Sequence, residues 1–163
     1  KTFGKGRWVE RYTNQQVYLD HKTIQAKKLS RIEVQEAAAN YVMRFDGVAR
    51  AISAEAIQRV GWTSGLMSRL ESGYNAQRSG DVLVVLQPGW FEGYGNGPQK
   101  GTTHGSHSNY DTHVPLVWYG WNVKPGESSA ETAVSDIAPT IASWLYIQEP
   151  NGSVGKPLQE LMK

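Results

Sequence analysis

The sequence predicts an α/β fold in which a mixed sheet is flanked by helices, with a smaller α+β lobe on the N-terminal side. Two compact apolar runs, 81–87 and 114–119, have the length and composition of buried strands. Apolar residues recur at helical spacing in 34–45 and 135–147. With 163 residues, of which 39% are hydrophobic and 20% charged, the chain can bury one ordinary core.

The first elements are a hairpin and a helix. Two short runs, 7–12 and 16–20, flank a polar turn, which is typical of two paired strands. Ser30 and Glu33 then form a capping box ahead of the helical repeat, which continues until Gly47. The sequence therefore predicts a long helix after Ser30.

Shorter elements follow. Residues 48–52 alternate as a strand does, Ser53 can cap a short helix that ends at Gly61, and a second short helix is expected over 64–72. The run 81–87 then predicts a strand inside a sheet, because apolar side chains occupy both of its faces.

A long loop separates this strand from the C-terminal elements. Residues 88–112 are rich in glycine and lack apolar periodicity, and compact domains usually keep such loops for function. The chemistry is expected there. A second buried strand is predicted over 114–119, a helix over 135–147 with Pro139 in its first turn, and a turn at 150–152.

Charge and hydropathy exclude two classes of partner. The net charge is +2 and comes from mixed signs along the chain, so no basic run could follow a nucleic-acid backbone. The longest apolar stretches, such as 82–86, are far below the roughly 20 residues that span a bilayer. We therefore expect neither a nucleic-acid partner nor a membrane anchor. The absence of cysteine excludes disulfides and thiolate metal sites in this chain.

Three of the four histidines lie within a span of ten residues at the end of the long loop. They are His104, His107 and His113, with Asp111 among them. Imidazole and carboxylate are ordinary zinc ligands, but a His-x2-His-x5-His spacing matches no compact zinc module. Two interpretations stay open: a local metal site, or a polar loop whose histidines bond backbone carbonyls.

Four further residues have two interpretations each. Asp136 can simply favour the dipole of its helix. Arg78 can pair with a phosphate or hold its loop in place. Trp90 and Tyr94 can line a ligand surface, although dense aromatic residues more often anchor loops and cores.

The C-terminal half also resembles a known family. Residues 101–126, GTTHGSHSNYDTHVPLVWYGWNVKPG, followed by SDIAPTIASWL at 135–145, resemble the C-terminal part of the threonine-nucleophile alkaline phosphatases. These belong to the alkaline phosphatase superfamily, close to the nucleotide pyrophosphatase/phosphodiesterases. NAQRSGDV at 75–82 and PNGSVGKPL at 150–158 fit the same family. The resemblance extends from about residue 73 to 161, and over the first seventy residues it is only general.

The resemblance implies a zinc-dependent hydrolase of phosphate monoesters, exported to the periplasm or secreted. In that family two zinc ions about 4 Å apart bind one phosphoryl group. A threonine alkoxide attacks phosphorus, and zinc-bound hydroxide then releases phosphate. The His of the Thr-His-Gly segment is the family's late zinc ligand, which assigns that role to His104. His107 and His113 would then lie beside the site and help to orient it.

The family's other active-site motifs are not recognisable upstream. The nucleophilic threonine, the early metal-binding aspartate, the Asp-x3-His ligands and the Asp-His pair precede this region in the family, and none is found in 1–73. Asp20-His21 lies in the predicted hairpin and lacks the surrounding sequence of that pair. We therefore expect no catalytic residue in this chain, no activity from it alone, and no zinc retained by it alone.

The chain is expected to consist of two parts. Residues 1 to about 80 would form an insertion lobe, and about 81–163 would complete the sheet of the catalytic domain. Two other functions stay open: a phosphodiesterase or nucleotide pyrophosphatase of the same superfamily, and a non-catalytic binding module that uses the loop around Trp90 and Tyr94. A sheet that lacks strands exposes edges, which favour a dimer of the fragment.

Overall fold

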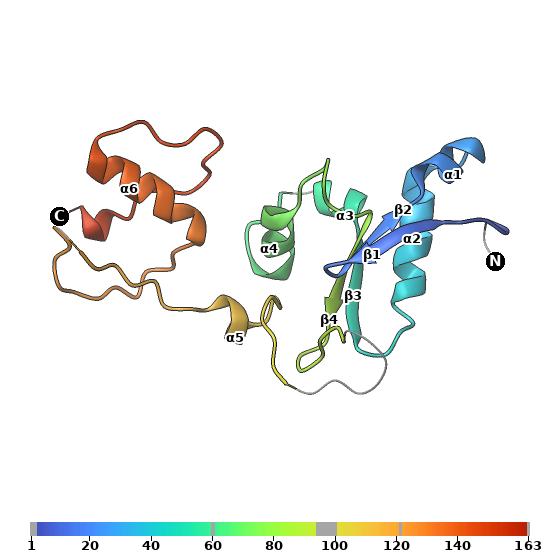
Figure 1. Cartoon of the computed structure of the whole chain (residues 1–163), viewed down its shortest axis with the longest axis horizontal. Coiled ribbons are helices and arrows are strands. Elements are labelled where there is room, and N and C mark those ends of the chain that lie inside the picture. Colours follow the sequence, from blue (N-terminus) through green and yellow to red (C-terminus); the bar gives the residue numbers. More distant parts are fainter. Residues whose placement is uncertain (1–2, 60, 94–100, 121, 163) are drawn as a thin grey trace. The chain divides into compact units, whose positions relative to one another are not determined.

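A computed structural model describes residues 3–59, 61–93, 101–120 and 122–162 (Figure 1). The chain divides into two compact units, Lys1–Val114 and Pro115–Lys163. Strands and helices of the first unit form an α/β arrangement, and the second unit contains one α-helix among its described residues. The predicted α/β fold class is confirmed.

The first unit is built on a four-stranded antiparallel sheet in the order β1-β2-β4-β3. Its strands are β1 (Val9–Thr13), β2 (Gln16–Leu19), β3 (Val48–Ser53) and β4 (Val82–Leu86). Strand β4 therefore has a paired strand on each side, and Val82, Leu83, Val84 and Val85 are all buried. The strand predicted over 81–87 is confirmed as an internal strand.

A two-residue turn joins β1 to β2. Asn14 and Gln15 have positive φ angles of 49° and 57°. A two-residue loop with positive φ at both positions matches the right-handed twist of paired strands. The predicted hairpin is confirmed, and its geometry follows from this turn.

Serine side chains cap the N-termini of two of the predicted helices. Ser30 Oγ accepts the N–H of Glu33 at 3.4 Å, and Ser53 Oγ accepts the N–H of Ala56 at 3.2 Å. The structure has α1 (His21–Ala26), α2 (Arg31–Val42), α3 (Ala54–Gln58), α4 (Gly65–Gly73), α5 (Asn109–Thr112) and α6 (Ile137–Leu145), with short 3-10 helices at Val134–Asp136 and Gln159–Leu161. The helices predicted after Ser30, after Ser53, over 64–72 and over 135–147 are confirmed.

The core of the first unit lies between the sheet and the helices α1 and α2. Strands β3 and β4 contact α2, which runs along the sheet in Figure 1. The buried residues of this cluster are Val17, Leu19, Ile24, Val34, Ala39, Val82 and Val84. They come from β2, α1, α2 and β4, so burial of one apolar layer fixes how these four elements pack.

The second predicted strand, 114–119, is wrong for this chain. The segment has no strand structure, and Val117 and Tyr119 are 81% and 100% exposed. A strand needs a neighbouring strand to bond its N–H and C=O groups, and apolar composition cannot supply that neighbour. No pairing to this segment occurs within the part of the chain that the structure describes.

No helix in the described ranges has the length and apolar character needed to cross a membrane.

Candidate functional site

The loop that carries the histidines is described over residues 101–113. Gly101 and Gly105 have φ angles of 126° and 97°, in a region that glycine adopts readily. Gly105 directly follows His104, and the short helix α5 begins after Ser108. Tyr94 lies outside the described residues, so its predicted part in a ligand surface stays a prediction.

Asp111 stabilises the conformation of this loop through a hydrogen bond to its backbone. Its Oδ2 accepts the backbone N–H of Ser106 at 2.9 Å. Hydrogen bonds from the side chain and the backbone of Ser106, together with the charge of His104, lower the pKa of Asp111. Asp111 is therefore ionised at neutral pH, and it lies close enough to His104 for their charges to interact.

The histidines differ in their surroundings. His104 and His113 are exposed, whereas His107 is half-buried. Burial, and then the charge of Arg69, lower the pKa of His107, so its neutral form is favoured at pH 7. Arg69 Nη1 also donates to Thr112 Oγ1 at 2.8 Å, which ties the loop to α4.

These side chains do not converge on a common point. His104, His107, Asp111 and His113 all lie in the described ranges, and there no three His, Asp or Glu side chains come close enough to hold a metal ion. The interpretation of the loop as a complete local metal site therefore has no support from the geometry. What the loop offers is an exposed imidazole, His104, next to a glycine that lets another group approach closely.

The sequence did not predict the polar cluster that surrounds Asp81. This carboxylate is 5% exposed. It accepts the N–H of Leu19 at 2.9 Å, Gln35 Nε2 at 2.8 Å, His21 Nε2 at 2.8 Å and the guanidinium of Arg31 at 3.0 Å. The four donors come from β2, α2, α1 and the start of α2, so Asp81 connects all of them to β4.

Two opposing effects act on the pKa of Asp81. Burial alone would raise it, but the hydrogen bonds from Leu19, Gln35 and His21, and the charge of His21, hold it below its ordinary value. The side chain is therefore ionised and bonded, as a buried charge in a folded protein must be. The only local signal was an aspartate directly before an apolar strand; its partners lie 46–62 residues away in sequence.

Asp136 has a structural role in the second unit. Its carboxylate accepts the N–H of Ala133 and the N–H of Lys156, each at 2.8 Å. Thr140, fully buried, accepts the N–H of Leu158 at 3.0 Å. These bonds fasten residues 156–158 to the start of α6, which accounts for Asp136 without any ligand.

Arg78 and Trp90 also make structural contacts. The carbonyl of Arg78 accepts a hydrogen bond from Tyr18 Oη at 3.1 Å. The ring of Trp90 lies so close to Gly47 that a Cβ there would overlap it, although Trp90 is still 52% exposed. Trp90 is therefore an anchor of the loop after β4 that keeps part of its ring in solvent.

The chain is similar to named proteins over almost its whole length. No family model matches it. It is 41% identical over 99% of its length to a protein of Myroides odoratus named calcium-transporting ATPase. It is 36% identical over 92% of its length to alkaline phosphatase PhoV of Synechococcus elongatus, and 36% identical over 98% to alkaline phosphatase PafA of Elizabethkingia meningoseptica.

A solved structure extends this similarity to the fold. The crystal structure of wild-type alkaline phosphatase PafA superposes with a TM-score of 0.86 at 35% identity over 99% of this chain. The chain corresponds to its C-terminal portion. It spans only 26–29% of the length of the three relatives and 31% of the PafA structure. Sequence and fold together make this chain a member of the alkaline phosphatase superfamily.

Proposed function

We propose that this chain is the C-terminal region of a zinc-dependent alkaline phosphatase that hydrolyses phosphate monoesters, and that His104 supplies one of its zinc ligands. The observation that carries the proposal is the match to two proteins named alkaline phosphatases over 92% and 98% of the chain. The relatives' names support phosphate-ester hydrolysis, and the position of His104 in the Thr-His-Gly segment supports its role.

The chain would not act alone. The loop presents the exposed imidazole of His104 beside Gly105, and the described residues offer no complete set of metal ligands. In a protein of the relatives' length, about seventy per cent of the polypeptide lies outside this chain, and the nucleophile and the other ligands would come from there. Zinc, when bound, would stabilise the charge on the transferring phosphoryl group.

Asp111 would prepare His104 for this role. A carboxylate that accepts the free ring N–H of a ligating imidazole fixes the orientation of that ring. Asp111 is held in place by Ser106 and is ionised at neutral pH, so its charge can act on His104. The glycine after His104 leaves room for the rest of the site to approach.

The test uses a protein of the relatives' full length and two matched variants. His104→Ala should remove about one zinc equivalent, measured by elemental analysis, and lower kcat/KM for an aryl phosphate by at least about 100-fold. Asn109→Ala, at an exposed position of the same loop, should keep both zinc ions and most of the activity. If the His104 variant retains full zinc and full activity, the assignment of His104 is wrong.

The isolated 163-residue chain provides a second test of the proposed function. With added zinc it should show no hydrolysis of an aryl phosphate above the buffer rate, because it lacks the nucleophile. Zinc-dependent turnover by the chain alone would contradict this. Elemental analysis of the same sample should find no stoichiometric zinc.

The preferred ester is tested on the longer protein. A phosphomonoesterase should hydrolyse an aryl monoester faster than the corresponding diester, whereas a phosphodiesterase of the superfamily would reverse this order. ATP belongs in the same comparison, because one relative is named a calcium-transporting ATPase. If Trp90→Ala abolished binding of a glycan or protein while His104→Ala had no effect, the alternative of a non-catalytic binding module would hold instead.

We also place the full-length protein in the periplasm or outside the cell, where a phosphatase releases phosphate from organic esters. Fractionation of cells that produce it should recover the activity outside the cytoplasm. Activity confined to the cytoplasmic fraction would contradict this location.

A further inference from the structure

A polar cavity of about 250 Å³ lies in the first unit, between the start of α2, helix α3 and residues 74–76. Five polar side chains line it, and Ile32 adds an apolar wall. The polar residues are Arg31, Gln35, Glu55, Gln58 and Tyr74. None of them belongs to the histidine loop, and the proposed phosphatase function does not use them.

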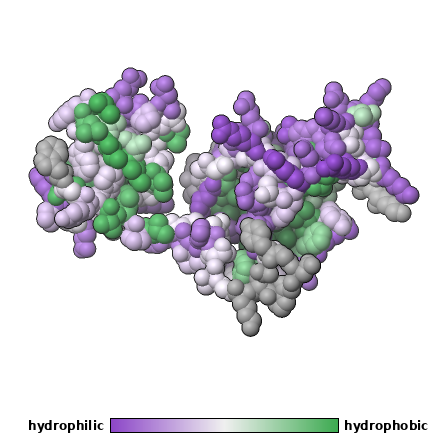
Figure 2. Space-filling view, viewed as in Figure 1, coloured by the Kyte–Doolittle hydropathy of each residue, from purple (hydrophilic) through white to green (hydrophobic). Residues whose placement is uncertain are grey.

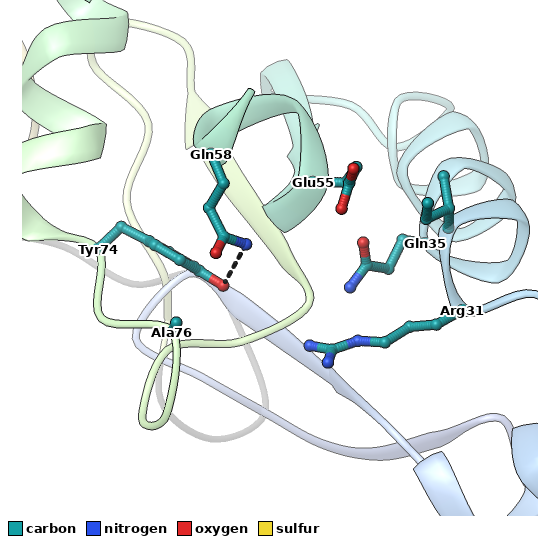
Figure 3. Close-up of a pocket in the computed structure, with 7 residues that line it drawn as sticks. Arg31, Gln35, Glu55, Gln58, Tyr74 and Ala76 are labelled. Atoms are coloured by element: carbon teal, nitrogen blue, oxygen red, sulfur yellow. Dashed lines mark hydrogen bonds between the residues drawn. The ribbon is translucent and has the colours of Figure 1, made fainter. Parts of the chain in front are cut away.

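Figure 3 shows these side chains converging on one space. Arg31 and Gln35 extend into it from α2, Glu55 and Gln58 from α3, and the ring of Tyr74 from the opposite wall. Gln58 Nε2 donates to Tyr74 Oη at 3.3 Å and to the carbonyl of Ala54 at 3.1 Å, which fixes the Gln58 amide.

The charges of the cavity are already paired. Arg31 bonds the carboxylate of Asp81 at 3.0 Å, and Glu55 bonds Arg59 Nε at 3.1 Å. An anionic ligand would face the carboxylate of Glu55, and a cationic ligand would face the guanidinium of Arg31. A neutral ligand avoids both repulsions.

The remaining polar atoms both accept and donate hydrogen bonds. Gln35 Nε2 is used by Asp81 and Gln58 Nε2 by Ala54 and Tyr74, so each amide keeps its oxygen as an acceptor. Tyr74 accepts from Gln58 and can donate its own proton. Burial raises the pKa of Tyr74, so this hydroxyl stays protonated at neutral pH.

We propose that this cavity binds a neutral polyhydroxylated ligand, such as a single sugar ring. Each hydroxyl group of a sugar can donate to Gln35, Gln58 or Glu55 and accept from Tyr74 or Arg31. The ring of Tyr74 and the side chain of Ile32 provide apolar surface for the C–H face of the ring. Cavities for drug-sized ligands have about 300–1,000 Å³, and this smaller volume suits one ring.

The experiment titrates the 163-residue chain with D-glucose, D-mannose, D-galactose and myo-inositol while following its amide NMR signals. At least one of them should bind with a Kd of about 1–10 mM and shift signals of α2, α3 and residues 74–76. Tyr74→Phe removes a donor and Glu55→Gln removes a charge, and each should weaken that binding about threefold to tenfold. Tyr41→Phe, an exposed tyrosine on α2, is the matched control and should bind as the parent does.

Other outcomes overturn the proposal. They are no binding of any of the four probes up to about 50 mM, equal binding by the cavity variants, and a preference for inorganic phosphate or glycine over the sugars. Circular dichroism confirms that each variant is folded. The result does not depend on the zinc site, because a His104→Ala chain should bind the same sugar equally well.

Discussion

Asp81 connects several elements of the first unit, so its replacement should lower the stability of that unit. Its carboxylate holds the N–H of Leu19, the ring of His21, the guanidinium of Arg31 and the amide of Gln35. The side chains of His21 and Arg31 are about half-exposed, at 49% and 51%, so water can partly replace the carboxylate around them. Removing the charge of Asp81 should therefore cost less unfolding free energy than removing one partner of a fully buried ion pair.

Asp81→Asn should lower the free energy of unfolding by about 2–3 kcal/mol at pH 7, because charged hydrogen bonds are lost and Leu19 and Gln35 meet a poorer acceptor. The pKa of Asp81 is lowered in the folded state, so its contribution is fully present above the ordinary aspartate pKa of about 3.9 and is lost as pH falls through the folded value. Urea unfolding should show the penalty shrinking as the pH falls below about 4. Asp46→Asn, at an exposed site, is the control; a penalty independent of pH would refute this account.

At the scale of elements, two serines that look alike in sequence differ in what they do. Ser53 is 2% exposed; its hydroxyl accepts the N–H of Ala56 and donates to Glu36 Oε1 at 2.8 Å. Ser64 precedes α4 but makes no such capping bond. Ser53→Ala should cost about 1–2 kcal/mol and Ser64→Ala less than about 0.5 kcal/mol, measured by urea unfolding. Equal effects of the two changes would show that the bonds of Ser53 contribute nothing.

The elements that sequence predicts well are those with local signals. Ser30 and Ser53 mark helix starts, and the turn at 14–15 fixes the hairpin, because each depends on residues a few positions away. The strand expected at 114–119 depended on a neighbour that local sequence cannot reveal. The Asp81 cluster was missed for the same reason, since its donors reach it only when β2, α1 and α2 pack on β4. Only the family resemblance distinguishes His104 from the other loop histidines as a metal ligand, because an exposed imidazole in a polar loop has no local feature that marks a metal ligand.

At the scale of the whole molecule, the two units differ in how well they bury apolar surface. The first unit has a contiguous core, whereas the second leaves large apolar side chains in solvent, visible as apolar surface in Figure 2. The most exposed of these are Val117, Tyr119, Val134, Tyr146 and Val154, at 79–100%. Apolar patches of this kind usually mark surfaces that another part of a protein covers. The chain should therefore bind the dye ANS when isolated, and a protein of the relatives' length should do so much less.

Tyr146 offers a sharper test, because its replacement should have opposite effects on the stability of the isolated chain and of the full-length protein. It ends α6 with φ 52° and ψ 40°, a left-handed conformation that favours glycine, and it is 96% exposed. Tyr146→Gly should stabilise the isolated chain by about 0.5–1 kcal/mol by relieving this strain. In the full-length protein the same change should destabilise by about 1–2 kcal/mol, because a covered tyrosine ring would be lost. Lys28→Gly, at an exposed position with φ 53°, should stabilise in both contexts, and a stabilising Tyr146→Gly in the full-length protein would show that nothing covers this side chain.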